Sequence, residues 1–300
     1  MSTASNLINR YAPFDTDLAS ALQANVSAAL AEDVGSGDVT GLLVPADEMV
    51  QAQVLVREHA VLCGAPWFDA VMQRLDARSR VEWSYAEGAA MHADRVVCRI
   101  AAPARALLTA ERCALNFLQL LSGVATATQR YVALIAGTKA SILDTRKTLP
   151  GLRLAQKYAV RVGGGMNQRL ALYDGILIKE NHIAAAGGVG AAMQTALALK
   201  AGVTIQIEVE SISQLREALE AGAVSILLDN FSLAQMREAV ALTAGRAVLE
   251  ASGGVNLDTV RAIGETGVDR ISIGSLTKDI RATDYSLRII GKAPSPEMPA

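Results

Sequence analysis

Aromatic residues, cysteine and histidine are all scarce in this chain. Only 4% of its 300 residues are aromatic, and it has three cysteines and three histidines. The cysteines form no CxxC pair, and the histidines do not cluster with them, which argues against a Cys/His metal site and favours a thiol-reducing cytoplasm. Because 51% of the residues are nevertheless hydrophobic, the core must be aliphatic, as is typical of α/β proteins.

Long apolar runs and an excess of charge are also lacking. No run reaches the roughly 18 residues that a membrane-spanning helix needs, and residues 1–17 contain no apolar core of a signal peptide. The formal net charge of −2 gives no general attraction to nucleic acid. Any anion site must therefore be a local cluster of Arg and Lys.

The first part of the chain predicts mixed α/β structure. We expect helices over 14–35, starting near Asp15, and over 64–77. A long helical region follows Pro103, and we expect a break in it at Gly123. The expected strands lie at 51–58, 60–64, 80–88 and 94–102, and a last strand at 285–291 is placed to return to the first domain.

From about residue 140, short apolar runs alternate with helical patterns. This alternation predicts a parallel sheet with helices outside it. Because there is no dinucleotide-binding GxGxxG motif, an incomplete barrel is favoured over an open Rossmann sheet. The apolar runs are at 141–144, 175–179, 204–210, 225–230, 247–254 and 270–275.

Charged or small residues follow each of these six runs. In a β/α barrel the carboxyl ends of the strands open onto one face, where the active site lies. The residues that we expect there are Arg146, Lys147, Lys179, Glu208, Asp229, Ser252, Gly253, Gly254, Gly274 and Ser275, with Arg169 brought to the same place by the glycine-rich run GGGMNQR at 163–169.

These residues suggest a site for a multiply charged anion. Arg146, Lys147, Arg169 and Lys179 would repel one another by about 1 kcal/mol or more per pair unless an anion lies between them. The SGG and IGS turns expose backbone N–H groups next to helix starts, which suits a phosphate, although ordinary βα loops use the same residues. Glu208 and Asp229 have two interpretations: they neutralise the lysines, or they bind Mg²⁺ and sugar hydroxyls.

Several motifs together resemble one enzyme family, the quinolinate phosphoribosyltransferases (decarboxylating). They are TAERCALNFLQLLSGVAT, ILDTRKTLPGLR, KYAVRVGGGMNQRLALYDGILIKENHI, IEVES, LLDNF, LEASGGV and ISIGSLT, and the similarity extends over most of residues 20–290. The resemblance implies a glycosyltransferase of NAD biosynthesis. It would join quinolinate to 5-phosphoribosyl-1-pyrophosphate (PRPP) with Mg²⁺ and yield nicotinate mononucleotide, pyrophosphate and CO₂.

The resemblance also implies a two-domain α/β fold and a homodimer or a multiple of dimers. An N-terminal α/β sandwich would comprise residues 1–124 and 281–300, and an incomplete α/β barrel with parallel strands would comprise 125–280. Each barrel would be completed by the neighbouring subunit.

The implied substrate-binding residues fall into groups. Arg146, Arg169 and Lys179 would bind the carboxylates of quinolinate, with Arg112 donated by the neighbouring subunit. Lys147 would bind PRPP, and the two glycine loops would bind its 5-phosphate. Glu208 and Asp229 would bind its ribose hydroxyls and would also bind Mg²⁺, directly or through water or PRPP. Lys147, Lys179, Glu208 and Asp229 form the implied catalytic group. The full implied substrate-binding set is Arg112, Thr145, Arg146, Lys147, Gln168, Arg169, Lys179, Glu208, Asp229, Ser252, Gly253, Gly254, Ile273, Gly274 and Ser275.

One position departs from the family pattern. The family commonly has His before the arginine of the glycine-rich motif, whereas this chain has Gln168. Glutamine can donate a hydrogen bond but carries no titratable proton. Three alternatives remain open: a pyrophosphorylase-like homologue of molybdenum-transport operons with another substrate, a barrel aldolase that uses Lys179 as a Schiff base, and a non-catalytic anion-binding protein.

Overall fold

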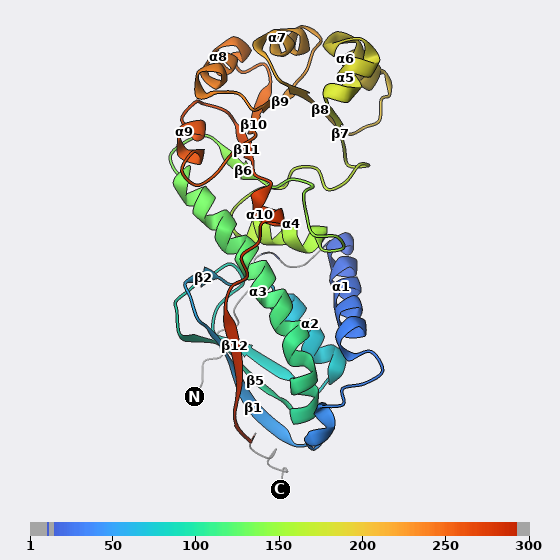
Figure 1. Cartoon of the computed structure of the whole chain (residues 1–300), viewed down its shortest axis with the longest axis vertical. Helices are drawn as coiled ribbons and strands as arrows, with labels where there is room; N and C mark the ends of the chain where they lie inside the picture. The colour runs from blue at the N-terminus through green and yellow to red at the C-terminus, as the bar shows by residue number, and fades with distance from the viewer. Residues whose placement is uncertain (1–10, 12–14, 293–300) are drawn as a thin grey trace. The chain divides into compact units, whose positions relative to one another are not determined.

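The computed structural model describes Tyr11 and residues 15–292 in two compact units (Figure 1). The first unit comprises residues up to 126, 150–163 and those from 280 onward, and the second comprises 127–149 and 164–279. The segment 150–163 was expected in the barrel but groups with the first unit. Its helix α4 (Arg153–Val162) packs there, where Tyr158 donates a hydrogen bond to Glu87 and Asn25 donates one to the carbonyl of Gly151.

The first unit is built on a four-stranded antiparallel sheet in the order β12-β1-β5-β3. Alternating burial along β1 shows that one face of this sheet is packed and the other is more open. The last strand pairs with β1, as expected from its sequence. The strands of this unit are β1 (Met49–Val56), β3 (Arg80–Trp83), β5 (Arg95–Pro103), β12 (Tyr285–Lys292) and the pair β2 (Ala60–Val61) and β4 (Ala90–Met91).

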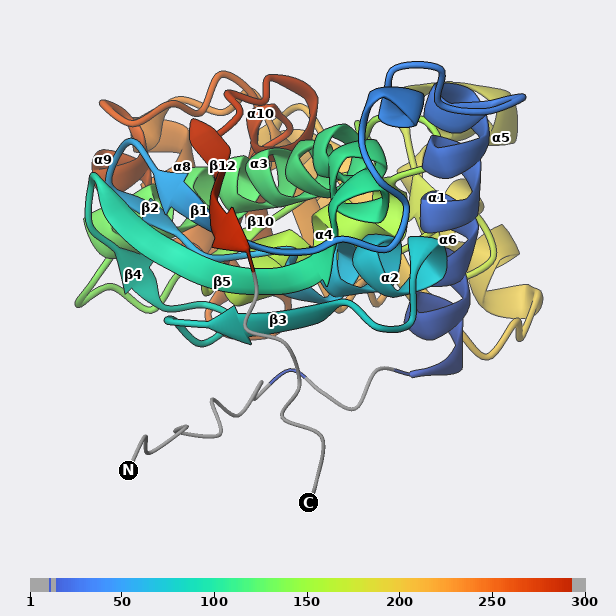
Figure 2. The same cartoon turned by 90° about the horizontal axis from the view of Figure 1, so that it is seen from below.

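The first two helices of the first unit lie where the local sequence signals predicted them. Helix α1 (Thr16–Val34) begins where Asp15 accepts a hydrogen bond from Leu18 N at 2.8 Å. Helix α2 (Ala65–Leu75) lies beside it, and a short 3₁₀ turn spans Gly41–Leu43 (Figure 2).

Helix α3 (Ala104–Leu134) is continuous, so the break expected at Gly123 was wrong. A side chain at Gly123 would collide with the carbonyl oxygen of Arg281, so glycine there permits close backbone contact rather than a break.

The second unit is an incomplete barrel of six parallel strands in the order β6-β11-β10-β9-β8-β7. Its helices lie outside the curved sheet, as Figure 1 shows for α5 to α8. The strands are β6 (Ser141–Leu143), β7 (Gly175–Ile178), β8 (Thr204–Val209), β9 (Ser225–Asp229), β10 (Val248–Ser252) and β11 (Arg270–Ser272). The helices are α5 (Glu180–Ala186), α6 (Val189–Ala198), α7 (Ile212–Glu220), α8 (Leu233–Thr243), α9 (Val260–Gly264) and α10 (Ser275–Lys278).

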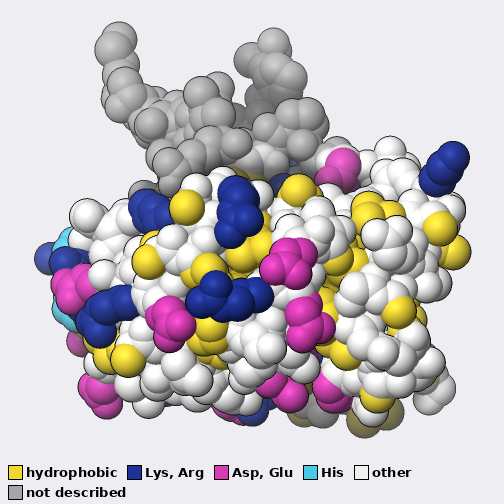
Figure 3. All heavy atoms as spheres, turned by 90° about the horizontal axis from the view of Figure 1, so that it is seen from above, with side chains coloured by type: hydrophobic (Ala, Val, Ile, Leu, Met, Phe, Trp, Pro, Cys, Tyr) yellow, Lys and Arg dark blue, Asp and Glu magenta, His cyan; other side chains and the backbone are white. Residues whose placement is uncertain are grey.

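The strands of the second unit are mostly apolar and buried, as a sheet covered by helices requires. No helix in the described part of the chain is long and apolar enough to cross a membrane. On the face shown in Figure 3, basic and acidic side chains are interspersed rather than separated. All three cysteines are buried and form no disulfide.

Candidate active site

The carboxyl ends of the six parallel strands carry the residues that the sequence predicted for this edge. Lys179 directly follows β7, Glu208 lies near the end of β8, and Asp229 ends β9. Ser252 ends β10, and Thr145 to Lys147 follow β6. Because neighbouring strands are parallel and in register, these residues share one edge of the sheet.

Lys179 and Glu208 form an ion pair at this edge. The ammonium of Lys179 lies 2.9 Å from Oε2 and 3.3 Å from Oε1 of Glu208, whose side chain is only 10% exposed. The main chain at Lys179 is fixed by His182, whose Nδ1 accepts a hydrogen bond from the Lys179 N–H at 3.0 Å. The KENH motif therefore fixes the direction in which the lysine leaves its strand.

Arg169 lies within electrostatic range of Arg146. Desolvation, followed by the charge of Arg146, lowers the pKa of Arg169. One guanidinium nitrogen of Arg169 donates to the carbonyl of Gly175 at 2.7 Å. Its Nε is buried and has no hydrogen-bond partner among the described residues. This arrangement keeps a positive charge in a partly dry position, where an anion would gain most from it.

Asp144 fixes the loop that carries Gln168 and Arg169. It is fully buried, accepts a hydrogen bond from the Gln168 N–H at 2.9 Å and accepts another from the Asn167 amide at 2.6 Å. Met166 also pairs with Leu143, so this loop runs alongside β6. Asp144 is the last residue of the run at 141–144, and the sequence indicated no role for it because Gln168 lies 24 residues further along the chain.

The loop after β11 lies against the loop after β6. A Cβ on Gly274 would lie 3.1 Å from Cδ of Lys147 and 3.6 Å from Oγ1 of Thr145. Thr277 Oγ1 donates to the carbonyl of Lys147 at 2.8 Å, and Ile273 N donates to the carbonyl of Leu143. Short helix α10 begins directly after Gly274 at Ser275. The IGS turn and Lys147 are therefore neighbours, as a shared phosphate site would require.

The turn after β10 requires glycine but is not followed at once by a helix. Gly253 has a φ of +101°, and a side chain there would collide with the amide of Asn230. Gly254 has a φ of +62°. The helix expected directly after SGG begins only at Val260, because Asn256 first caps a turn through the N–H groups of Asp258 and Thr259. A helix start therefore adjoins only the IGS turn.

The carboxylates at this edge form a small set. Asp229 accepts a hydrogen bond from Asn230 at 2.9 Å, while Glu208 is engaged with Lys179. Within residues 15–292, no group of three or more His, Cys, Asp or Glu side chains could hold a metal by itself. The other predicted residue, Arg112, is exposed on α3 in the first unit.

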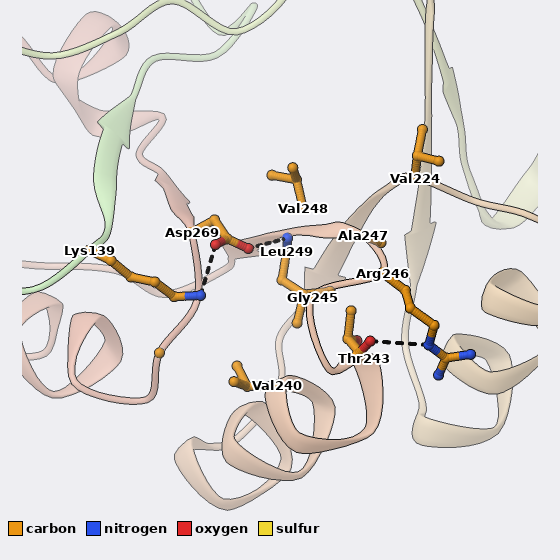
Figure 4. A pocket seen from close by; sticks show the side chains of 11 residues that line it. Lys139, Val224, Val240, Thr243, Gly245, Arg246, Ala247, Val248, Leu249 and Asp269 are labelled. Carbon is orange, nitrogen blue, oxygen red and sulfur yellow. Dashed lines mark hydrogen bonds and ion pairs between the residues drawn. The ribbon is translucent and has the colours of Figure 1, made fainter.

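A separate pocket of about 240 Å³ lies at the opposite edge of the same sheet (Figure 4). It is lined by the amino ends of β9 and β10 and by an ion pair of 2.8 Å between Lys139 and Asp269. Asp269 also accepts a hydrogen bond from Leu249 N. These contacts stabilise the amino edge and involve none of the predicted site residues.

Two family models match the chain. The quinolinate phosphoribosyl transferase N-terminal domain matches residues 38–122, and the C-terminal domain of the same family matches 124–288. The chain belongs to the quinolinate phosphoribosyltransferase family.

Individual members of the quinolinate phosphoribosyltransferase family are similar along most of their length. A protein of Bacillus subtilis (strain 168) named probable nicotinate-nucleotide pyrophosphorylase [carboxylating] is 39% identical over 86% of this chain and 90% of its own. The chloroplastic enzyme of the same name from Oryza sativa subsp. japonica is 39% identical over 89% of this chain and 77% of its own. The solved nicotinate-nucleotide pyrophosphorylase of Francisella tularensis is 41% identical and covers 92% of this chain and 98% of its own, with a TM-score of 0.88.

Within this phosphoribosyltransferase fold, sequence reasoning missed two polar residues that are connected to Gln168 by hydrogen bonds. Gln168 donates to Gln206 at 2.9 Å, and Gln206 donates to the buried Glu250 at 2.9 Å. The available signal was polarity: Gln206 and Glu250 are polar residues inside otherwise apolar strands.

Proposed function

We propose that this chain transfers the phosphoribosyl group of PRPP to quinolinate with decarboxylation, and that the carboxyl edge of its parallel sheet holds both substrates. The products are nicotinate mononucleotide, pyrophosphate and CO₂. The observation that carries this proposal is the buried Nε of Arg169, which has no hydrogen-bond partner among the described residues, in a guanidinium that also feels the charge of Arg146. Like charges in such a position favour a dianionic ligand, and quinolinate carries two carboxylates.

The two substrates take different parts of the edge. Arg146, Arg169 and Lys179 bind the quinolinate carboxylates, and Gln168 adds a neutral hydrogen bond. Thr145 and Lys147 bind PRPP beside the IGS turn, a placement supported by the contact of Gly274 with both. Glu208 and Asp229 bind the ribose hydroxyls, and Ser252, Gly253 and Gly254 bind the 5-phosphate together with Ile273, Gly274 and Ser275.

The donor set fits a Mg²⁺ that arrives with PRPP. Mg²⁺ usually keeps several waters and takes one or two protein carboxylates in addition to substrate phosphates. Glu208 and Asp229, at the ends of adjacent strands, supply that number. Bound there, Mg²⁺ would neutralise charge on the pyrophosphate as it leaves.

The protein's own groups mainly position the substrates and neutralise charge. The bond between C1 of the ribose and pyrophosphate breaks while the pyridine nitrogen of quinolinate bonds to C1, and Lys147 stabilises the leaving pyrophosphate. The nitrogen becomes a pyridinium. Its charge stabilises the carbanion left when the adjacent carboxylate departs as CO₂, and this carbanion then takes a proton. No covalent enzyme intermediate is required.

A homodimer completes the site in this proposal. Arg112 is exposed on α3, where it is available to the site of a neighbouring subunit. The loop of Arg169 carries Leu172 and Tyr173, which are 74% and 76% exposed. Apolar side chains this exposed beside a charged site are typical of surfaces that another chain covers.

The deciding experiment is release of labelled CO₂ from carboxyl-labelled quinolinate, with and without PRPP and Mg²⁺. We expect release only when all components are present, and loss with EDTA that Mg²⁺ restores. Absence of release with all three would contradict the proposal and favour a homologue with another substrate or a silent anion-binding protein. Borohydride trapping of a carbonyl substrate on Lys179 would instead indicate an aldolase.

A further inference from the structure

Three polar side chains are connected in a row on one face of the parallel sheet. Gln168 Nε2 donates to Gln206 Oε1 at 2.9 Å, and Gln206 Nε2 donates to Glu250 Oε2 at 2.9 Å. Gln206 lies on β8 and Glu250 on β10, so their bond crosses over β9. Gln206 is 7% exposed and Glu250 1% exposed. The row therefore runs from a buried carboxyl group to the loop that carries Arg169.

Glu250, the buried end of this row, keeps one carboxyl oxygen away from water without a hydrogen bond to replace it, which costs stability. Glu250 Oε1 is buried and has no hydrogen-bond partner among the described residues. Burial raises the pKa of Glu250, against the opposing effects of Gln206, Ser272 and Arg270, while the charge of Asp144 raises it further. An apolar side chain would be cheaper in a sheet of this kind. A function in holding Gln168, at the other end of the row, would account for the presence of polar residues at positions 206 and 250.

We propose that Glu250 and Gln206 are positioning residues of the substrate site, which hold the Gln168 side chain through two amide hydrogen bonds and set which end of its amide faces quinolinate. This inference rests on the proposed function. The direction of the neutral Gln168 amide is then imposed from inside the sheet.

The direction follows from what each group can donate. An ionised Glu250 only accepts, so Gln206 turns its NH₂ toward Glu250 and its carbonyl oxygen toward Gln168. Gln168 then donates one N–H of its own NH₂ to Gln206 and keeps the second N–H for a substrate carboxylate. A protonated Glu250 can donate instead, which lets both amides reverse and turns the Gln168 NH₂ toward the substrate carboxylate. Arg270 on β11 favours the first arrangement, and Asp144 after β6 favours the second.

A double-mutant cycle tests the connection. Gln206→Leu and Gln168→Ala should each raise KM for quinolinate by about three- to tenfold, the range for one neutral hydrogen bond, with KM for PRPP changed by less than about twofold. The double variant should be no worse than the poorer single variant, because both remove the same contact. Glu250→Gln should change the pH dependence of KM for quinolinate, because its amide does not titrate.

The matched control is Thr243→Val. Thr243 is buried in the same unit, its Oγ1 has no hydrogen-bond partner among the described residues, and it lies by the opposite edge. This variant should leave both KM values unchanged. Independent, additive effects of Gln206→Leu and Gln168→Ala, or an unchanged KM for quinolinate in Gln206→Leu beside a raised one in Gln168→Ala, would overturn the proposal.

A second measurement separates this inference from the proposed function. If the wild-type protein released no CO₂ from quinolinate, the function would fail, but the connection could still be measured in crystals. In the Gln206→Leu variant the Gln168 side chain should leave its wild-type rotamer while Asp144 still holds its main chain. An unchanged Gln168 side chain would contradict the inference whatever the activity.

Discussion

The ammonium of Lys179 lies 2.9 Å from Oε2 of Glu208 and joins the ends of β7 and β8. In the proposed site these two residues serve different substrates, Lys179 for quinolinate and Glu208 for the ribose of PRPP. Because the two residues are in contact, the charge of Glu208 also affects the binding of quinolinate, and the charge of Lys179 also affects the binding of PRPP.

Glu208→Gln should therefore affect both substrates. We expect a roughly 10- to 100-fold rise in KM for PRPP, since a hydrogen bond to a charged group contributes about 1.5–3 kcal/mol. KM for quinolinate should change less. Steady-state kinetics with each substrate varied would measure this. Lys139→Met and Asp269→Asn, which break the 2.8 Å pair at the opposite edge, are the controls. An equal effect of Asp269→Asn on PRPP would show that the loss is one of stability.

Arg146→Ala should nearly abolish quinolinate binding and leave the fold intact. The variant loses a charge-assisted contact and leaves a substrate carboxylate unpaired, which costs more than about 2 kcal/mol. Titration calorimetry with quinolinate measures the affinity, and Arg237→Ala, an exposed arginine on α8, is the control. A loss of less than about threefold would mean that Arg146 is not a ligand.

Arg112 gives a test of the dimer. Arg112→Ala and Lys179→Ala proteins should each be inactive, because each damages every site. Heterodimers of the two should regain up to about half of the wild-type activity per dimer, since one site then contains both residues. Activity of purified, differently tagged heterodimers decides the point. No recovery would indicate that Arg112 does not act across subunits.

Asp69 predicts a pH dependence of stability in the first unit. Burial, partly offset by the hydrogen bond from Trp83, raises the pKa of Asp69 to about 7. The native state therefore holds a proton that the unfolded chain has released. The resulting stabilisation is complete below about pH 4 and is lost as the pH rises through about 7.

Asp69→Asn removes this titration and keeps an acceptor for the Trp83 N–H. The free energy of unfolding of the variant minus that of the wild type should rise by on the order of 1–3 kcal/mol as the pH is raised from 5 to 8. Both tryptophans, Trp67 and Trp83, lie in the first unit, so their fluorescence during urea unfolding reports on it. Asp258→Asn, at an exposed site, is the control. A difference that does not vary with pH would show that Asp69 does not titrate in this range.

Much of the fold could be predicted because local patterns agree with it. The six apolar runs of the second half are the six parallel strands, and Asp15 caps the first helix, as expected. The prediction at Gly123 was wrong because this glycine makes room for the carbonyl oxygen of Arg281, a residue far along the chain. The segment 150–163 was misplaced for the same reason: its partners, Glu87 and Asn25, are distant in sequence.

By itself, the sequence determined the succession of strands and the charged or small residues that follow each of them, because strand pattern and strand ends are local properties. It also determined the family, through motifs that stand in a fixed order. Only the tertiary structure decided that Lys179 pairs with Glu208 and that Glu250 reaches Gln168 through Gln206. These contacts join residues 29 to 44 positions apart. A contact of that range depends on the order and curvature of the strands, which no local pattern encodes.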